Sequence, residues 1–73
     1  MIIECKNNKF LFDSSISEEK AQSLANKIVE FCSENSVDLT LLNGDVFEGI
    51  LSCPISLTNT PNGIEVKVLA PLH

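Results

Sequence analysis

The segment 37–51 constrains the fold most, because two apolar-rich runs flank the dipeptide Asn43-Gly44 within it. Asn-Gly is among the dipeptides that most readily adopt positive φ at both centres of a tight hairpin turn. We therefore expect a β-hairpin that turns at Asn43-Gly44 and forms the middle of a sheet. The other strands and a helix are expected to pack around it.

An amphipathic helix is expected between Ser17 and Asn35. Ser17 is a suitable N-cap, and Glu18 and Glu19 follow it in the first turn, where the helix dipole favours anions. Ser15 and Glu18 form a competing capping box. Asn35 can adopt the left-handed conformation that ends a helix. The apolar positions of the predicted buried stripe are Ala21, Leu24, Ala25, Ile28, Phe31 and Cys32.

Two short strands, 2–5 and 9–12, are expected before the helix, with the turn at Asn7-Asn8. A two-stranded hairpin is only marginally stable by itself, so these strands are expected to join the central sheet.

The chain after the central hairpin is expected to complete the sheet. Residues 51–58 alternate between apolar and polar types, but Pro54 cannot donate to a strand ladder, so this segment should lie at an edge or be bulged. Residues 59–63 form a turn cluster, and the alternating strand 64–68 is ended by Pro71.

The predicted fold is a single α+β domain over residues 1–73, in the order β-β-α-β-β-β. Short connections favour antiparallel pairing. We therefore expect an antiparallel sheet of four to five strands with one helix on one face.

Self-association is also expected, as a homodimer. Adjacent apolar residues in the predicted strands send side chains to both sheet faces, whereas one helix covers only one. A chain of 73 residues also buries only about 60% of its surface, which leaves a small net stability. The alternative is a strongly coiled sheet or small barrel that hides both sets of side chains. The candidate self-association residues are Leu11, Leu42, Phe47 and Leu69.

The charge distribution argues against a duplex-DNA reader. The chain has ten acidic residues, five lysines and no arginine, for a formal charge of −5. Arginine supplies the bidentate contacts to phosphate and guanine on which such proteins depend. Residues 28–66 contain six acids and no base, which forms either a solvated surface or a surface for a basic partner. The candidate partner-binding residues are Asp38, Asp45 and Glu48.

Catalytic, metal and cofactor sites are not expected. Cys5, Cys32, Cys53 and His73 include no pair with the two-to-four-residue spacing of a zinc site. A cysteine or serine nucleophile would need a base, and the only histidine is residue 73. The glycines lack the spacing of a phosphate-binding loop. In the predicted hairpin, the candidate carboxylates of residues 38 and 48 lie on opposite sides of the sheet.

A cytoplasmic location is expected. The three cysteines are odd in number and widely spaced, which is typical of free thiols in a reducing compartment. The first residues lack a basic segment followed by a long apolar one, and no apolar run reaches membrane-spanning length.

Residues 39–51 resemble the first motif of Sm-like proteins, which has a strand, an Asn-Gly turn, an aromatic residue two positions before a glycine, and a following leucine. Asn43-Gly44, Phe47, Gly49 and Leu51 carry this resemblance. It implies a ring-shaped oligomer that binds RNA. Residues 52–55 replace the Asp and Asn residues that contact RNA in the family, and the Arg-Gly pair of its second motif has no counterpart.

We therefore expect a small acidic, non-enzymatic interaction module that binds a basic surface on another protein, as an inhibitor or accessory protein. Compact acidic proteins of this kind occur among phage and mobile-element inhibitors, an analogy of size and charge alone. The alternative is an Sm-like oligomer that binds RNA or a small ligand.

Overall fold

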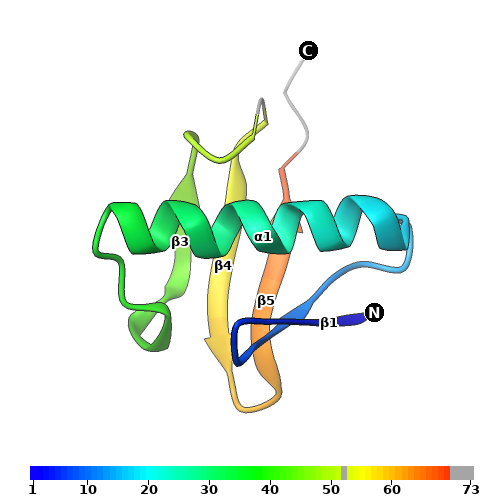
Figure 1. Cartoon of the computed structure of the whole chain (residues 1–73), viewed down its shortest axis with the longest axis horizontal. Helices are drawn as coiled ribbons and strands as arrows, with labels where there is room; N and C mark the ends of the chain where they lie inside the picture. The colour runs from blue at the N-terminus through cyan, green and yellow to red at the C-terminus, as the bar shows by residue number, and fades with distance from the viewer. Residues whose placement is uncertain (52, 70–73) are drawn as a thin grey trace.

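One α-helix lies across one face of a five-stranded sheet in the computed structural model, which describes residues 1–51 and 53–69 (Figure 1). The predicted α+β class and element order are confirmed. Pro71, which is predicted to end the last strand, and His73, the only histidine of the sequence, lie outside the described residues. No helix of the described chain is long and apolar enough to span a membrane. The elements are β1 (Ile2–Cys5), β2 (Asn8–Leu11), α1 (Glu18–Glu34), the 3₁₀ helix η1 (Leu39–Leu41), β3 (Asn43–Phe47), β4 (Ile55–Thr60) and β5 (Gly63–Val68).

Helix α1 begins and packs as its sequence predicts. Ser17 is the N-cap, and its Oγ accepts a hydrogen bond from the backbone N–H of Lys20 at 3.3 Å. Phe31 is half-buried at the edge of the stripe that faces the sheet. The other five predicted positions are buried: Ala21, Leu24, Ala25, Ile28 and Cys32.

The helix ends at Glu34 as predicted, but the left-handed residue is one position later than expected. Asn35 is the C-cap with φ −105°, whereas Ser36 takes the left-handed conformation with φ 55°. This geometry lets the N–H of Val37 donate to the carbonyl of Cys32 at 2.9 Å, the long hydrogen bond of a Schellman motif. The chain therefore turns sharply toward the sheet after α1.

The sheet is mixed, so the expectation of purely antiparallel pairing is wrong. Its strand order is β1-β2-β5-β4-β3, and β2 runs parallel to β5 while the other pairs are antiparallel. The parallel register pairs Phe10 with Ile64, and both side chains are buried under α1. β5 is therefore the central strand of the sheet, with β2 on one side and β4 on the other.

The hairpin predicted at Asn43-Gly44 does not form. Residues 39–41 form η1 instead, and Gly44, with φ 76°, lies at a register shift within the edge strand β3. The N–H of Asn59 donates to the carbonyl of Leu42 at 3.0 Å, so this segment pairs with β4 and not with itself. The strand–turn–strand on which the Sm-like resemblance depends is therefore absent from residues 39–51.

Two smaller expectations about turns and strand ends also change. Lys6 and Asn7, with φ values of 47° and 68°, form the first hairpin turn, one residue earlier than predicted. Pro54 lies just before β4, where it removes no ladder hydrogen bond, so β4 can be an interior strand. The predicted turn after β4 is confirmed, with Pro61-Asn62 at its centre.

The sheet buries one face and leaves the other largely polar. The register places these residues on the helix-free face: Ile2, Glu4, Lys9, Leu11, Val46, Ser56, Thr58, Glu65 and Lys67. Leu11 on β2 and Val46 on β3 are separated by β5 and β4, so they do not form one apolar patch. The core on the opposite face consists of Ile3, Cys5, Phe10, Phe12, Ala21, Leu24, Ala25, Ile28, Cys32, Leu42, Ile50, Ile55, Leu57, Ile64 and Val66.

Candidate functional site

The C-terminal half of α1, η1 and β3 together form one side of the molecule (Figure 1). Phe31 of α1 and Phe47 of β3 hold the helix and strand together through an edge-to-face ring contact, with centroids 5.8 Å apart. Five acidic residues lie on these elements and the loops beside them, and we call them the acidic flank: Glu30, Glu34, Asp38, Asp45 and Glu48.

All five carboxylates of the acidic flank belong to exposed residues. Asp38 caps η1, and its Oδ1 accepts hydrogen bonds from the Thr40 hydroxyl at 2.6 Å and the Thr40 N–H at 2.9 Å. The hydrogen bond from the Thr40 hydroxyl, and after it the one from the Thr40 N–H, hold the pKa of Asp38 below its ordinary value. Asp38 is therefore ionised at neutral pH. The flank therefore presents its negative charge to solvent.

The structure brings the predicted acids to the same side of the molecule but does not pair them across a hairpin. Asp38 precedes η1 and Glu48 follows β3, so a 3₁₀ helix and a five-residue strand lie between them in the chain. The two residues are therefore not opposite one another on paired strands.

Exposed apolar side chains accompany the acids. Leu41 of η1 is 75% exposed and Val46 of β3 is 56% exposed. β3 is also an edge strand, so its outer side offers unpaired backbone groups, while Asp45 and the shift at Gly44 make uncontrolled pairing less favourable. This mixture of apolar side chains with a charged rim is typical of protein-binding surfaces.

The four candidate self-association residues lie in different environments. Leu42 is buried in the core, 4% exposed, and Phe47 packs against Phe31 within the chain. Leu11 is half-buried on the helix-free face, and Leu69 is 37% exposed after β5. Leu69 is therefore the most exposed of the four, Leu11 and Phe47 are both half-buried, and Leu42 offers almost no surface to another molecule.

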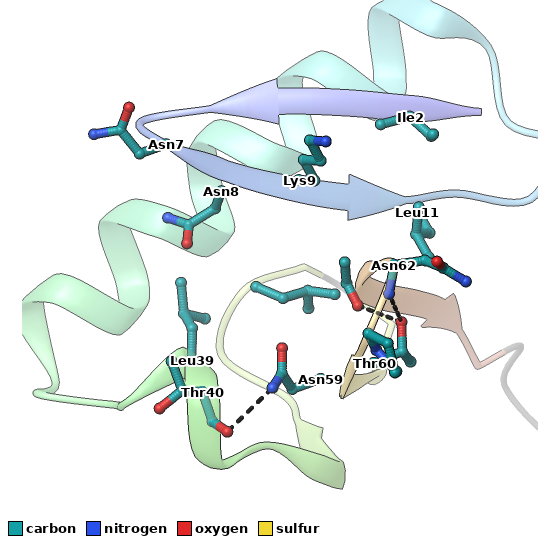
Figure 2. Close-up of a pocket in the computed structure, with 13 residues that line it drawn as sticks. Ile2, Asn7, Asn8, Lys9, Leu11, Leu39, Thr40, Asn59, Thr60 and Asn62 are labelled. Carbon is teal, nitrogen blue, oxygen red and sulfur yellow. Dashed lines mark hydrogen bonds between the residues drawn. The ribbon is translucent and has the colours of Figure 1, made fainter.

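An open cleft of about 790 Å³ lies at one end of the sheet, between the β1–β2 hairpin, the β4–β5 turn and η1 (Figure 2). Side-chain amides dominate its polar lining: Asn7, Asn8, Asn59 and Asn62. The Asn59 amide donates to the carbonyl of Thr40 at 3.2 Å, which ties β4 to η1. The sequence predicts turns at these asparagines. Only the parallel β2–β5 pairing shows that the β1–β2 turn and the β4–β5 turn lie at the same end of the sheet.

The chemistry of the cleft is that of hydrogen bonding. Its only charged lining residue is Lys9, and the remaining polar groups are amides and hydroxyls. The described residues include no group of three potential metal ligands. Burial raises the pKa of the Cys32 thiol, which disfavours the thiolate required of a nucleophile.

Neither a protein-family model, nor a curated protein, nor a solved structure gives a significant match to this chain. Function must therefore be argued from the surface itself.

Proposed function

We propose that the protein is a non-enzymatic interaction module whose acidic flank binds a basic surface on a partner protein. The observation that carries the proposal is the concentration of acidic residues on the flank, although Lys27 lines a depression with Glu30 and Glu34. The flank holds five of the ten acidic residues, and the remaining five acids are balanced by the five lysines. The formal charge of −5 is therefore equal to the charge of the flank alone.

A one-sided charge of this size acts mainly on association. It attracts a basic surface over distances of about a Debye length, roughly 8–10 Å at physiological salt, and orients the encounter. Leu41 of η1 and Val46, which lies on the helix-free side of the edge strand β3, add exposed apolar area on the same side of the molecule. A partner with lysines or arginines around an apolar groove would complement both features.

An inhibitory role is part of the proposal. A basic surface of the target that normally contacts nucleic acid would be blocked by the flank, whose carboxylates replace phosphate groups. The three cysteines are free thiols, which supports a reducing compartment such as the cytoplasm.

The test measures binding of a labelled decapeptide of alternating lysine and valine. Neutralising Asp45→Asn and Glu48→Gln together should weaken binding by about fivefold, at roughly 0.5 kcal/mol per exposed charge. The double variant should also show a smaller dependence of affinity on salt. The matched control is Glu4→Gln with Glu19→Gln, which changes the net charge equally but lies outside the flank.

The peptide in which glutamate replaces lysine should not bind. Equal weakening by the flank variant and by its control would show that only the net charge of the protein matters, and the proposed binding surface would then be wrong. Unchanged affinity in the flank variant would refute it as well.

A further inference from the structure

Helix α1 crosses the end of β5 (Figure 1). A second concave surface, the apolar groove, lies there beside the N-terminal half of the helix. It has a volume of about 360 Å³. Its lining differs in character from both the acidic flank and the amide-lined cleft. The residues that line it are Ile16, Lys20, Ser23, Leu24, Lys27, Leu51 and Val68.

Apolar side chains from separate segments form the groove. Leu24 contributes from α1, Val68 from the end of β5, and Ile16 and Leu51 from the segments that precede α1 and follow β3. Val68 is 41% exposed and Ile16 and Leu51 are half-buried, so these three are open to solvent, whereas Leu24 is 5% exposed. Exposed apolar surface in a concave site is favourable for binding an apolar chain.

Among the described residues of the lining, the charged ones are Lys20 and Lys27. They are seven residues apart on α1, so they lie on one side of the helix about 10 Å apart at ~1.5 Å per residue. Within the described part of the chain, neither has an ion-pair partner, because the one salt bridge joins Lys67 to Glu65. Glu18 and Glu19 line a different depression of α1.

We propose that the apolar groove binds a small amphipathic monocarboxylate, such as a medium-chain fatty acid. The hydrocarbon chain lies along Leu24, Leu51 and Val68, and the carboxylate contacts one of the two lysines. Two lysines are the cationic groups among the described lining residues, and no arginine accompanies them. A single carboxylate therefore fits better than a polyphosphate, which needs several converging donors.

The size of the groove favours a small molecule over a protein. It is lined by seven residues, whereas a stable protein interface uses roughly 20–30 residues on each side. Its volume falls within the ~300–1,000 Å³ of small-ligand pockets. The groove and the acidic flank share no residue, but they adjoin at Lys27, which also lines a depression with Glu30 and Glu34.

The test is an NMR titration of the full chain with hexanoate, octanoate and decanoate, each below its critical micelle concentration. The methyl signals of Ile16, Leu24, Leu51 and Val68 should shift in a saturable way. At ~0.8 kcal/mol per buried CH₂, each added methylene should tighten binding about fourfold until the groove is filled. No saturable shift at these methyl groups would overturn the proposal.

The role of the lysines is tested separately with decanol, which has the same chain without the charge. Lys20→Gln with Lys27→Gln should weaken decanoate binding about two- to fivefold and leave decanol binding unchanged. The matched control, Lys6→Gln with Lys9→Gln, should change neither. Equal affinity of the unmodified protein for decanoate and decanol would refute recognition of the carboxylate, as would equal weakening by both pairs of substitutions.

Discussion

The substitution Gly63→Ala tests the least expected feature of the fold, the parallel pairing of β2 with β5. Gly63 begins β5 with φ 138°, a conformation that residues with a side chain rarely adopt. A Cβ at this position would lie 2.8 Å from the carbonyl oxygen of Lys9 and 3.2 Å from its Cβ. The alanine methyl group must therefore displace the backbone of β2.

Two costs add in this variant. Holding an L-residue at positive φ costs about 1–2 kcal/mol, and relieving the contact with a backbone oxygen that packing holds in place adds roughly 1–2 more. We expect a loss of about 2–4 kcal/mol from a total stability of about 4–11 kcal/mol for a chain of this length. The melting temperature should fall by roughly 8–32 °C.

The assay is equilibrium unfolding in urea, followed by circular dichroism, with Gly44→Ala as the control. Gly44 also has positive φ, 76°, but the nearest atom to its added Cβ is the Thr58 Oγ1 at 4.0 Å. The control should therefore lose only the conformational term, about 1–2 kcal/mol. If Gly63→Ala is no more destabilising than Gly44→Ala, then β2 does not approach β5 as described.

Two further predictions concern Asp38 and the cysteines. Removing the hydroxyl donor in Thr40→Val should raise the pKa of Asp38 toward its ordinary value, as measured by the carboxyl ¹³C shift during titration. Because the pKa of Asp38 is lower in the folded state, its ionised carboxylate stabilises the fold above the unfolded pKa, and this contribution is lost as the pH falls through the folded pKa. The Thr40→Val variant should therefore lose less stability than the unmodified protein over that acidic range. An unchanged titration of Asp38 in the variant would contradict the assignment. In native-state thiol labelling at pH 8, Cys53, which is half-buried, should react faster than Cys32, which is 3% exposed and has a raised pKa. Faster modification of Cys32 in the folded protein would contradict its place in the core.

The individual residues of the acidic flank could be predicted from the sequence, but their grouping could not. Asp38, Asp45 and Glu48 stand out because no basic residue lies between positions 28 and 66. Glu65 belongs to the same acidic run, yet it lies on the central strand β5, 3.7 Å from the ammonium of Lys67. Strand order therefore determines which acids share a surface, and it cannot be inferred from the distribution of charged residues along the sequence.

The apolar groove and the amide-lined cleft could not be predicted for the same reason. Each is assembled from segments far apart in the chain, and each contributing residue has an ordinary local explanation. Leu24 fits the helix stripe, and Asn62 fits a turn. The residues that neighbour each position in the sequence do not indicate that Leu24 and Leu51 line the same groove, or that Asn8 and Asn62 line the same cleft.

The sequence by itself determined the features that depend on neighbouring residues. Helix α1, its Ser17 cap and its buried stripe follow from the spacing of side chains within a few turns, and the Pro61-Asn62 turn follows from local backbone preferences. These interactions need no distant partner, so they are readable from short windows of sequence.

Only the tertiary structure decided how the strands are paired. Asn43-Gly44 favours a tight turn, but the free energy of this local preference is small compared with that of burying Leu42 and of packing Phe47 against Phe31. Both contacts are made with β3 paired to β4. The parallel β2–β5 pair likewise depends on Phe10 and Ile64 reaching the same core from sequence positions far apart. Strand pairing is determined by the total burial that all elements achieve together, and the local sequence around each strand does not contain that quantity.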